Sequence, residues 1–241
     1  AGSHYDWRFF RKLDYSVLER QKILRRTIRC WLNFTNQAGI VTWLAHGTLL
    51  GWSWNKKSLP WDADIDVQMS VSMLWKLAKY NQTLVVDVSD DSNSLHSYFL
   101  DVGLAILARQ RDRGVNTIDA RFIDVDSGMY IDITGLSFTD SCYSVPLNDD
   151  AVSLELKGLL GSSGQHLYEE YCEIRSKLHH QGEIYNCKNN HFYSRYELQL
   201  MPSIFEGVTA YVPIGWAGIL EREYPNWRQT RYKQWEFIEG E

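Results

Sequence analysis

The sequence lacks the features of a membrane-spanning chain and those of a general nucleic-acid-binding protein. No stretch approaches about 18 uninterrupted apolar residues, so no segment of this sequence is expected to span a membrane. The formal net charge is −5, whereas a general nucleic-acid-binding protein would present a basic face. With 241 residues and 44% hydrophobic content, the chain can bury a full hydrophobic core. One domain, or one domain with a small appendage, is therefore expected.

Cysteine is also scarce, and its four positions leave several alternatives open. Cys30 lies near the apolar stripe of an expected helix and is interpreted as a buried thiol. The other three cysteines allow one disulfide, for which Cys142 and Cys187 are the preferred pair, or none. The spacing of Cys187 and His191 would also suit half of a zinc site, although one such pair is a weak signal.

The most informative stretch runs over residues 43–69, which we interpret as a strand, a glycine-marked turn, a loop and a second strand. In residues 64–69 (DIDVQM) acidic and polar residues alternate with apolar ones, as in a half-buried strand. The alternation places Asp64 and Asp66 on one face. Two carboxylates this close repel each other unless a cation lies between them, and Mg²⁺ and Mn²⁺ prefer carboxylate oxygens. The stretch therefore predicts a metal site, with an exposed acidic face as the alternative.

The residues before this strand indicate a site for phosphate. Gly47 and Thr48 lie in the expected turn, where exposed backbone amides can surround a phosphate group. Lys56 and Lys57 lie between the turn and the carboxylates, although an exposed loop explains either lysine equally well. A calcium loop of the EF-hand type is excluded, because its glycine and glutamate positions are not occupied by those residues. A glycosyltransferase D-x-D site remains an alternative.

Residues 46–51 (HGTLLG) followed by residues 60–67 (PWDADIDV) resemble the signature of the LicD family. That family includes bacterial phosphocholine transferases, fukutin, fukutin-related protein and the fungal mannosylphosphate-transfer proteins. The resemblance implies an α+β fold of the nucleotidyltransferase type, with a small mixed sheet flanked by helices and additional loops and helices in the C-terminal half. It also implies that Asp64 and Asp66 are metal ligands, and that Asp62 lies near the metal or orients the pair.

Residues 121–134 predict a hairpin with its turn near residues 126–128. Asp132 falls on the polar face of the second strand and resembles the third carboxylate of this fold, in a sequence context similar to the fungal branch. Such a group can complete the metal coordination or accept the proton of an attacking hydroxyl. The alternative is an aspartate at a strand edge. Arg121 and Asp124 are expected to pair with each other or to contact substrate.

Further elements follow from local patterns. Ser16 and Glu19 form an expected capping box for a helix that ends at Gly39, and its basic face is expected to be mostly solvated. The other expected elements are a strand over residues 40–44, a helix from Ser70 to about Tyr80, a strand over 84–88, a helix over 165–178 and a hairpin over 205–213.

The C-terminal half resembles the distal LicD motifs in order, so the resemblance covers roughly residues 40–225. Pro225 stands where the family commonly has glycine, and the basic residue that would contact the donor phosphate is not in its usual place. Arg195 is the candidate for that role, together with Lys188. The first four residues (AGSH) look like a remnant of an expression tag. Residues 5–241 are expected to form one LicD-like catalytic domain.

The resemblance implies a phosphotransferase that depends on Mg²⁺ or Mn²⁺. It would move mannose-1-phosphate from GDP-mannose, or phosphocholine from CDP-choline, onto a glycan hydroxyl and release a nucleoside monophosphate. Asp64, Asp66 and Asp132 would be the metal ligands, and Asp132 or Asp62 would accept the proton. The alternatives are a metal-dependent glycosyltransferase and a non-catalytic accessory subunit that binds glycans. Two N-x-[ST] sequons, at Asn33 and Asn81, fit the secretory pathway, with the Golgi lumen as the expected compartment.

Overall fold

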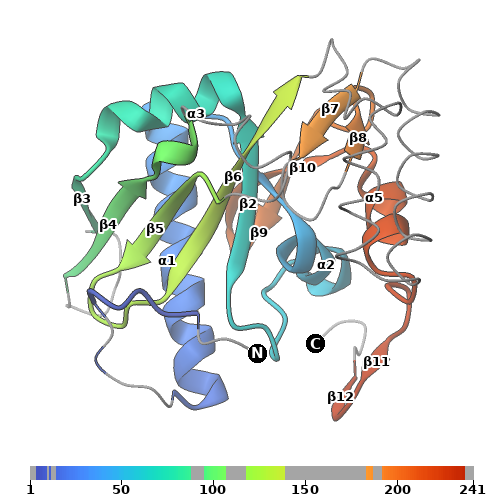
Figure 1. Ribbon diagram of the computed structural model, residues 1–241. Coiled ribbons are helices and arrows are strands. Elements are labelled where there is room, and N and C mark those ends of the chain that lie inside the picture. Colours follow the sequence, from blue (N-terminus) through green and yellow to red (C-terminus); the bar gives the residue numbers. More distant parts are fainter. Residues whose placement is uncertain are drawn as a thin grey trace, which may run out of the picture.

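The computed structural model describes residues 4–9, 11, 15–87, 95–106, 118–138, 183–186 and 192–236. Helices and a mixed β-sheet form an α+β fold, which confirms the expected fold class (Figure 1). Cys142, Cys187, Lys188, His191 and the helix expected over residues 165–178 lie outside the described residues. None of the described helices has the length and apolar character needed to cross a membrane.

An eight-stranded sheet forms the centre of the molecule. Six strands lie in the order β1-β2-β6-β5-β4-β3, while β7 pairs with β6, and β8 pairs with β7. Strands β2 and β6 are parallel, and the other neighbouring strands are antiparallel. The strands are β1 (Trp43–Leu44), β2 (Ile65–Ser70), β3 (Leu84–Asp87), β4 (His96–Val102), β5 (Ala120–Asp124), β6 (Tyr130–Phe138), β7 (Glu183–Asn186) and β8 (Phe192–Ser194).

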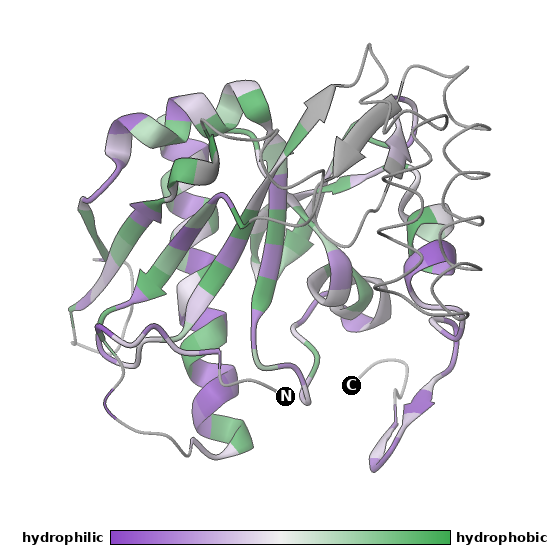
Figure 2. Cartoon of the chain, in the orientation of Figure 1, coloured by the Kyte–Doolittle hydropathy of each residue, from purple (hydrophilic) through white to green (hydrophobic). Residues whose placement is uncertain are grey.

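Helix α1 (Val17–Ala38) packs on β5 and β6, and its ends form as the sequence predicts (Figure 1). The capping box of Ser16 and Glu19 is present at its start, and Gly39 ends it in the left-handed conformation. Trp31 is fully buried in the core, where its ring lies 5.3 Å from that of Phe122 on β5. Along β2 and β6, hydrophobic and hydrophilic residues alternate (Figure 2), in agreement with the predicted period of two.

Short elements connect the sheet as expected, with small differences in their bounds. Helix α3 (Val71–Leu77) begins at Ser70, whose hydroxyl accepts a hydrogen bond from the Met73 amide, and the 3₁₀ helix η1 (Ala78–Tyr80) continues it. A second 3₁₀ helix, η2 (Leu104–Ile106), follows β4.

The segment after β1 differs from the sequence prediction. Residues expected to form a glycine-marked turn belong instead to helix α2 (His46–Asn55). The glycines in this helix are needed for close packing: a Cβ at Gly51 would lie 2.5 Å from the Lys57 carbonyl oxygen. Lys56 ends the helix in the left-handed conformation, with φ of 63°. A single sequence gives no sign of this contact, because the pair of glycines alone favours a turn.

The C-terminal part adds a hairpin, a helix and a small second hairpin. These are β9 (Leu200–Phe205), β10 (Val208–Pro213), α5 (Trp216–Glu223), β11 (Arg231–Tyr232) and β12 (Trp235–Glu236). The hairpin predicted over residues 205–213 is confirmed, with its turn at Glu206 and Gly207, which both have positive φ. Strand β10 packs against β1 and α1, and α5 packs against α2.

Candidate metal and phosphate site

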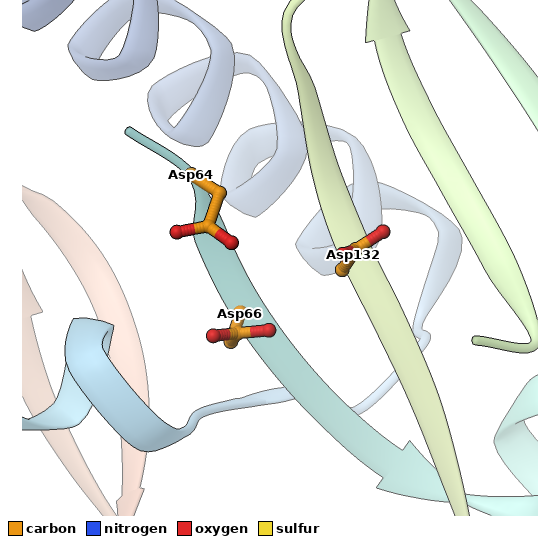
Figure 3. Close-up of side chains that lie close together, drawn as sticks. All are labelled: Asp64, Asp66 and Asp132. Atoms are coloured by element: carbon orange, nitrogen blue, oxygen red, sulfur yellow. The ribbon is translucent and has the colours of Figure 1, made fainter. Parts of the chain in front are cut away.

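Three carboxylates meet on two neighbouring strands of the sheet (Figure 3). Asp66 on β2 lies directly opposite Asp132 on β6 in the parallel register, and Asp64 immediately precedes β2. Each residue offers one oxygen, and these oxygens lie within 4.8 Å of one another. Asp132 is 6% exposed, whereas Asp64 and Asp66 are half-buried. The three residues that the sequence singled out are therefore brought together by the fold.

The donor set fits a hard divalent cation. All three side chains offer carboxylate oxygen, which Mg²⁺ and Mn²⁺ prefer over the nitrogen and sulfur donors favoured by softer metals. Three acidic groups at this separation repel one another, and their partial burial strengthens the repulsion. A cation among these oxygens would remove the repulsion. The geometry can thus hold a metal, and the assignment of the ligands remains a prediction.

Two basic side chains among the described residues contact this cluster: His4, whose Nδ1 lies 3.4 Å from Asp64 Oδ2, and Arg121 on β5. Arg121 lies opposite Asp132 in the β5–β6 register, and its Nε donates a hydrogen bond to Asp132 Oδ1 over 3.0 Å. Its guanidinium group stacks on the Tyr130 ring at 4.3 Å from the centroid. The expectation that Arg121 pairs with Asp124 is wrong, because the cross-strand register places Asp132 beside it instead.

Asp124 pairs with the first helix. Arg26 of α1 donates to both Asp124 oxygens at 3.2 Å, and the carboxylate is fully buried. Arg29 of the same helix donates to the Glu206 carbonyl oxygen over 2.8 Å. The basic face of α1 is therefore less solvated than the sequence suggested, because part of it fastens the helix to the sheet and to the β9–β10 turn.

Asp62 lies beside the metal cluster, against the start of α2. A Cβ at Gly47 would lie 2.6 Å from Asp62 Oδ2, so this carboxylate occupies the space that the glycine leaves. Burial raises the pKa of Asp62 to about 7, and the nearby charges of Asp64 and Asp66 act in the same direction. Asp62 therefore holds a proton more readily than an ordinary aspartate.

The start of α2 faces the same carboxylates. Thr48 Oγ1 accepts a hydrogen bond from the Asp66 amide over 2.9 Å, which ties the first turn of the helix to β2. The amides of Gly47 and Thr48 belong to this first turn, where helix geometry supplies no carbonyl partner. Such a helix start attracts phosphate. Gly47 and Thr48 thus lie at the start of a helix and not in the expected turn. Their role in phosphate binding stays a prediction.

Among the described residues, the three other basic residues predicted to bind the donor phosphate are Lys56, Lys57 and Arg195. The Lys56 ammonium group stacks on the Trp52 ring at 3.6 Å and donates to the Trp52 carbonyl oxygen, and partial burial lowers its pKa. Its contacts are thus with its own helix. Lys57 is exposed in the loop that follows, and Arg195 is exposed in the turn after β8. A role for any of the three in donor binding remains a prediction.

The sequence did not predict a hydrogen-bond network that joins Gln68, His46, Glu223 and Tyr193 next to the site. His46 Nδ1 lies 2.8 Å from Glu223 Oε2, and Tyr193 donates to Glu223 Oε1 over 2.5 Å. Because the Trp43 indole donates to Gln68 Oε1, the Gln68 amide nitrogen faces His46 Nε2, 3.3 Å away. This order makes His46 Nδ1 the donor to Glu223. This hydrogen-bond network links α5 to His46, the first residue of α2, whose φ is 48°.

Aromatic rings flank the loop that precedes β2. Trp61 directly precedes Asp62, and its ring centroid lies 5.4 Å from that of Trp54 and 4.7 Å from that of Tyr232. Trp235 lies 6.4 Å away on the other strand of the small hairpin. These contacts hold β11 and β12 against the loop that carries Asp62.

Comparison with known proteins agrees with the geometry. Residues 39–143 match the family described as LicD/FKTN/FKRP, nucleotidyltransferase domain, a range that includes all four aspartates of the site. The chain is also similar to two proteins of Saccharomyces cerevisiae. It is 31% identical to Mannosyltransferase regulator 4 over 294 aligned positions (92% of this chain), and 43% identical to Mannosyltransferase regulator 14 over 141 positions (56% of this chain).

The chain spans 25% of the length of the first relative and 15% of the second. Both relatives carry names from mannose transfer, which fits the fungal branch of the family and a context of glycan modification. Residues 39–143 hold Gly47, Thr48 and the three clustered carboxylates in one matched segment. The chain therefore contains a nucleotidyltransferase domain of the LicD family.

Proposed function

We propose that this chain is a metal-dependent phosphotransferase that modifies glycans. The observation that carries the proposal is the meeting of Asp64, Asp66 and Asp132 on two adjacent parallel strands, with oxygens within 4.8 Å of one another. The family match and the partly buried, purely oxygen donor set support it. The donor would be a nucleotide-activated group, and the acceptor a glycan hydroxyl.

Asp64, Asp66 and Asp132 would hold Mg²⁺ or Mn²⁺, which when bound neutralises charge on the reacting phosphate. The amides of Gly47 and Thr48 at the start of α2 would donate to phosphate oxygens. Arg121 fixes the orientation of Asp132 by donating to its Oδ1. Because that oxygen of Asp132 is engaged, Asp62 is the better placed of the two carboxylates to accept the proton of the acceptor hydroxyl.

The bond changes define the products. The acceptor oxygen forms a bond to the donor phosphorus that carries the transferred group, while the phosphoanhydride bond to the nucleotide breaks. The hydroxyl proton passes to Asp62, and a nucleoside monophosphate leaves. GDP-mannose is the first donor we propose, because the relatives are named for mannosyltransferase regulation; CDP-choline is the second. We expect this chemistry in the secretory pathway, in the Golgi lumen.

A second candidate function follows from the same relatives. Both are named as regulators, which favours an accessory subunit that keeps the fold and acts on a mannosyltransferase without turnover of its own. A metal-dependent glycosyltransferase is the third alternative, since a D-x-D pair can also hold a nucleotide sugar. The three functions differ in their products: a phosphodiester, no product, or a glycosidic bond without phosphorus.

The test is a transfer assay with product masses. The purified chain would be incubated with Mn²⁺, mannose oligosaccharides, and GDP-mannose or CDP-choline. We expect a product that gains the phosphorylated group, and we expect Asp64→Asn and Asp66→Asn to lower the rate by more than about a hundredfold. Asp126→Asn is the matched control, because Asp126 is an exposed aspartate of the β5–β6 turn. A product without phosphorus indicates a glycosyltransferase, and no turnover with either donor indicates an accessory subunit.

A further inference from the structure

A row of charged residues crosses four strands of the sheet beside the site. The strand registers place Asp66 opposite Asp132, Asp132 opposite Arg121, and Arg121 opposite Asp101. The row thus runs from β2 through β6 and β5 to β4. Arg121 is its one cation, and it is directly next to the three clustered carboxylates.

The far end of this row already has its own partner. Arg8 pairs with Asp101 and also with Asp6, donating to Asp6 Oδ2 over 2.8 Å. Asp101 thus has a cation of its own. The carboxylate that Arg121 contacts directly is Asp132, with Asp6 interacting at longer range. The guanidinium group of Arg121 therefore lies next to the carboxylate cluster, through its hydrogen bond to Asp132.

We propose that Arg121 binds the diphosphate of the nucleotide donor, an inference that rests on the proposed function. Its Nε is engaged by Asp132 Oδ1 at 3.0 Å, and the described residues include no hydrogen-bond acceptor for its terminal nitrogens. A guanidinium group has five N–H donors in a planar fork, which matches phosphate oxygens in pairs. Its terminal N–H groups are therefore available to a phosphate held at the carboxylates.

The surroundings hold this side chain ready for an anion. The Tyr130 ring, 4.3 Å from the guanidinium carbon, supports its plane on one side, and the side chain is 39% exposed. A phosphate can thus reach it from solvent. By contrast, Lys56 contacts Trp52 of its own helix, so Arg121 is better placed for the phosphate role than this lysine, one of the candidates named from the sequence.

Three variants of the full chain test this inference: Arg121→Gln and Arg121→Lys, with Arg222→Gln as the control. Arg222 is the matched control, because it also pairs with a carboxylate, Glu197, and its side chain is 40% exposed. Calorimetry would measure the affinity for Mn²⁺ alone and then, at saturating Mn²⁺, for GDP, CDP and pyrophosphate. Pyrophosphate carries no base and reports the phosphate contact by itself.

We expect Arg121→Gln to weaken diphosphate binding by about 10- to 100-fold, the range for hydrogen bonds to charged groups. Its affinity for Mn²⁺ should not fall by more than about threefold, because Arg121 competes with a cation for Asp132 and its removal relieves that competition. Arg121→Lys should lose less, since it keeps the charge but not the fork. Arg222→Gln should bind like the natural protein. If Arg121→Gln fails to fold in a thermal melt, Arg121→Lys decides the question.

Unchanged diphosphate affinity in the folded Arg121 variants would overturn the inference. So would a loss that merely follows a loss of Mn²⁺ affinity, because Arg121 would then only position Asp132. A natural protein that binds Mn²⁺ but none of the three diphosphates also contradicts it and leaves the metal site standing. A natural protein that binds no Mn²⁺ contradicts the proposed function itself.

Discussion

At the scale of single residues, the two glycines of α2 allow close packing against neighbouring atoms, whereas the sequence predicted that they form a turn. Gly47 leaves room for the end of the Asp62 side chain, whereas Gly51 leaves room for backbone, the Lys57 carbonyl oxygen. A side-chain carboxylate can rotate away from an added methyl group, but a packed backbone cannot. The same substitution should therefore have unequal effects at the two positions.

Gly51→Ala should lower the free energy of unfolding by about 1–3 kcal/mol, as overpacking does in other cores. Gly47→Ala should change it by less than about 1 kcal/mol, because alanine also favours the helix and offsets the contact with Asp62. Urea unfolding of both variants measures the difference. A Gly51→Ala protein as stable as the natural one would show that the contact is not rigid.

Cys30 provides a test of burial at one residue. It is 4% exposed, and burial raises the pKa of its thiol to about 12. An unfolded thiol has a pKa of about 8.5, so above that pH the unfolded chain gains thiolate that the folded chain does not. The contribution of Cys30 to stability is complete below that pH and is lost as the pH rises toward 12.

Alkylation follows from the same burial, because the thiolate is the reactive form. At pH 8, iodoacetamide should modify Cys30 at least about a hundredfold more slowly in the native protein than in urea. Peptide mass spectrometry distinguishes Cys30 from the other cysteines. Equal rates in the two states would mean that this part of α1 is not packed as described.

The sequence could predict which aspartates form the site, but not their partners. Period-two alternation, a local property of each strand, places Asp64, Asp66 and Asp132 on polar faces, and the resemblance to the LicD family implies that Asp132 joins the other two. The ion pairs of Arg121 with Asp132 and of Arg26 with Asp124 depend on strand register and helix docking. Those are long-range features that no single stretch of sequence encodes.

At the scale of elements, α5 and α2 are joined through one glutamate. The Glu223 side chain is 3% exposed and accepts from His46 at the start of α2 and from Tyr193 on β8. His46 has a positive φ, which is uncommon for a residue with a side chain. The bond from Glu223 therefore helps to keep the start of α2 in its place beside Asp66.

Glu223→Ala should lower the free energy of unfolding by about 2–3 kcal/mol, because it removes a buried carboxylate that accepts from both His46 and Tyr193. Glu223→Gln should cost less, since one side-chain oxygen remains to accept from one of them. Chemical denaturation of the two variants, followed by tryptophan fluorescence, gives both values. Equal stability of the alanine variant and the natural protein would contradict the structural role of this link.

Elements with clear local signals were predicted correctly, and one with conflicting signals was not. The capping box at Ser16, the αL glycine at Gly39 and the serine cap at Ser70 confirm three helix ends. Helix α2 was missed because its glycines indicate a turn, and tertiary contacts reverse that preference. Although the turn was predicted in place of a helix, the predicted location of Gly47 and Thr48 next to the carboxylates agrees with the structure.

At the scale of the whole molecule, the parallel pairing of β2 and β6 creates the site. It brings Asp66 and Asp132 into direct register although they lie 66 positions apart in the sequence. The family match covers this pairing, while the chain spans only a quarter of the length of Mannosyltransferase regulator 4. Whether this domain is catalytic depends first on whether it binds metal.

The most direct measurement is therefore calorimetric titration of Mn²⁺ into the natural protein, Asp66→Asn and Asp126→Asn. We predict that the natural protein and Asp126→Asn bind Mn²⁺ alike, and that Asp66→Asn loses at least about tenfold in affinity through loss of one charged ligand. Equal Mn²⁺ affinity in all three proteins, or no binding by the natural protein, would contradict the assignment of the three carboxylates as a metal site.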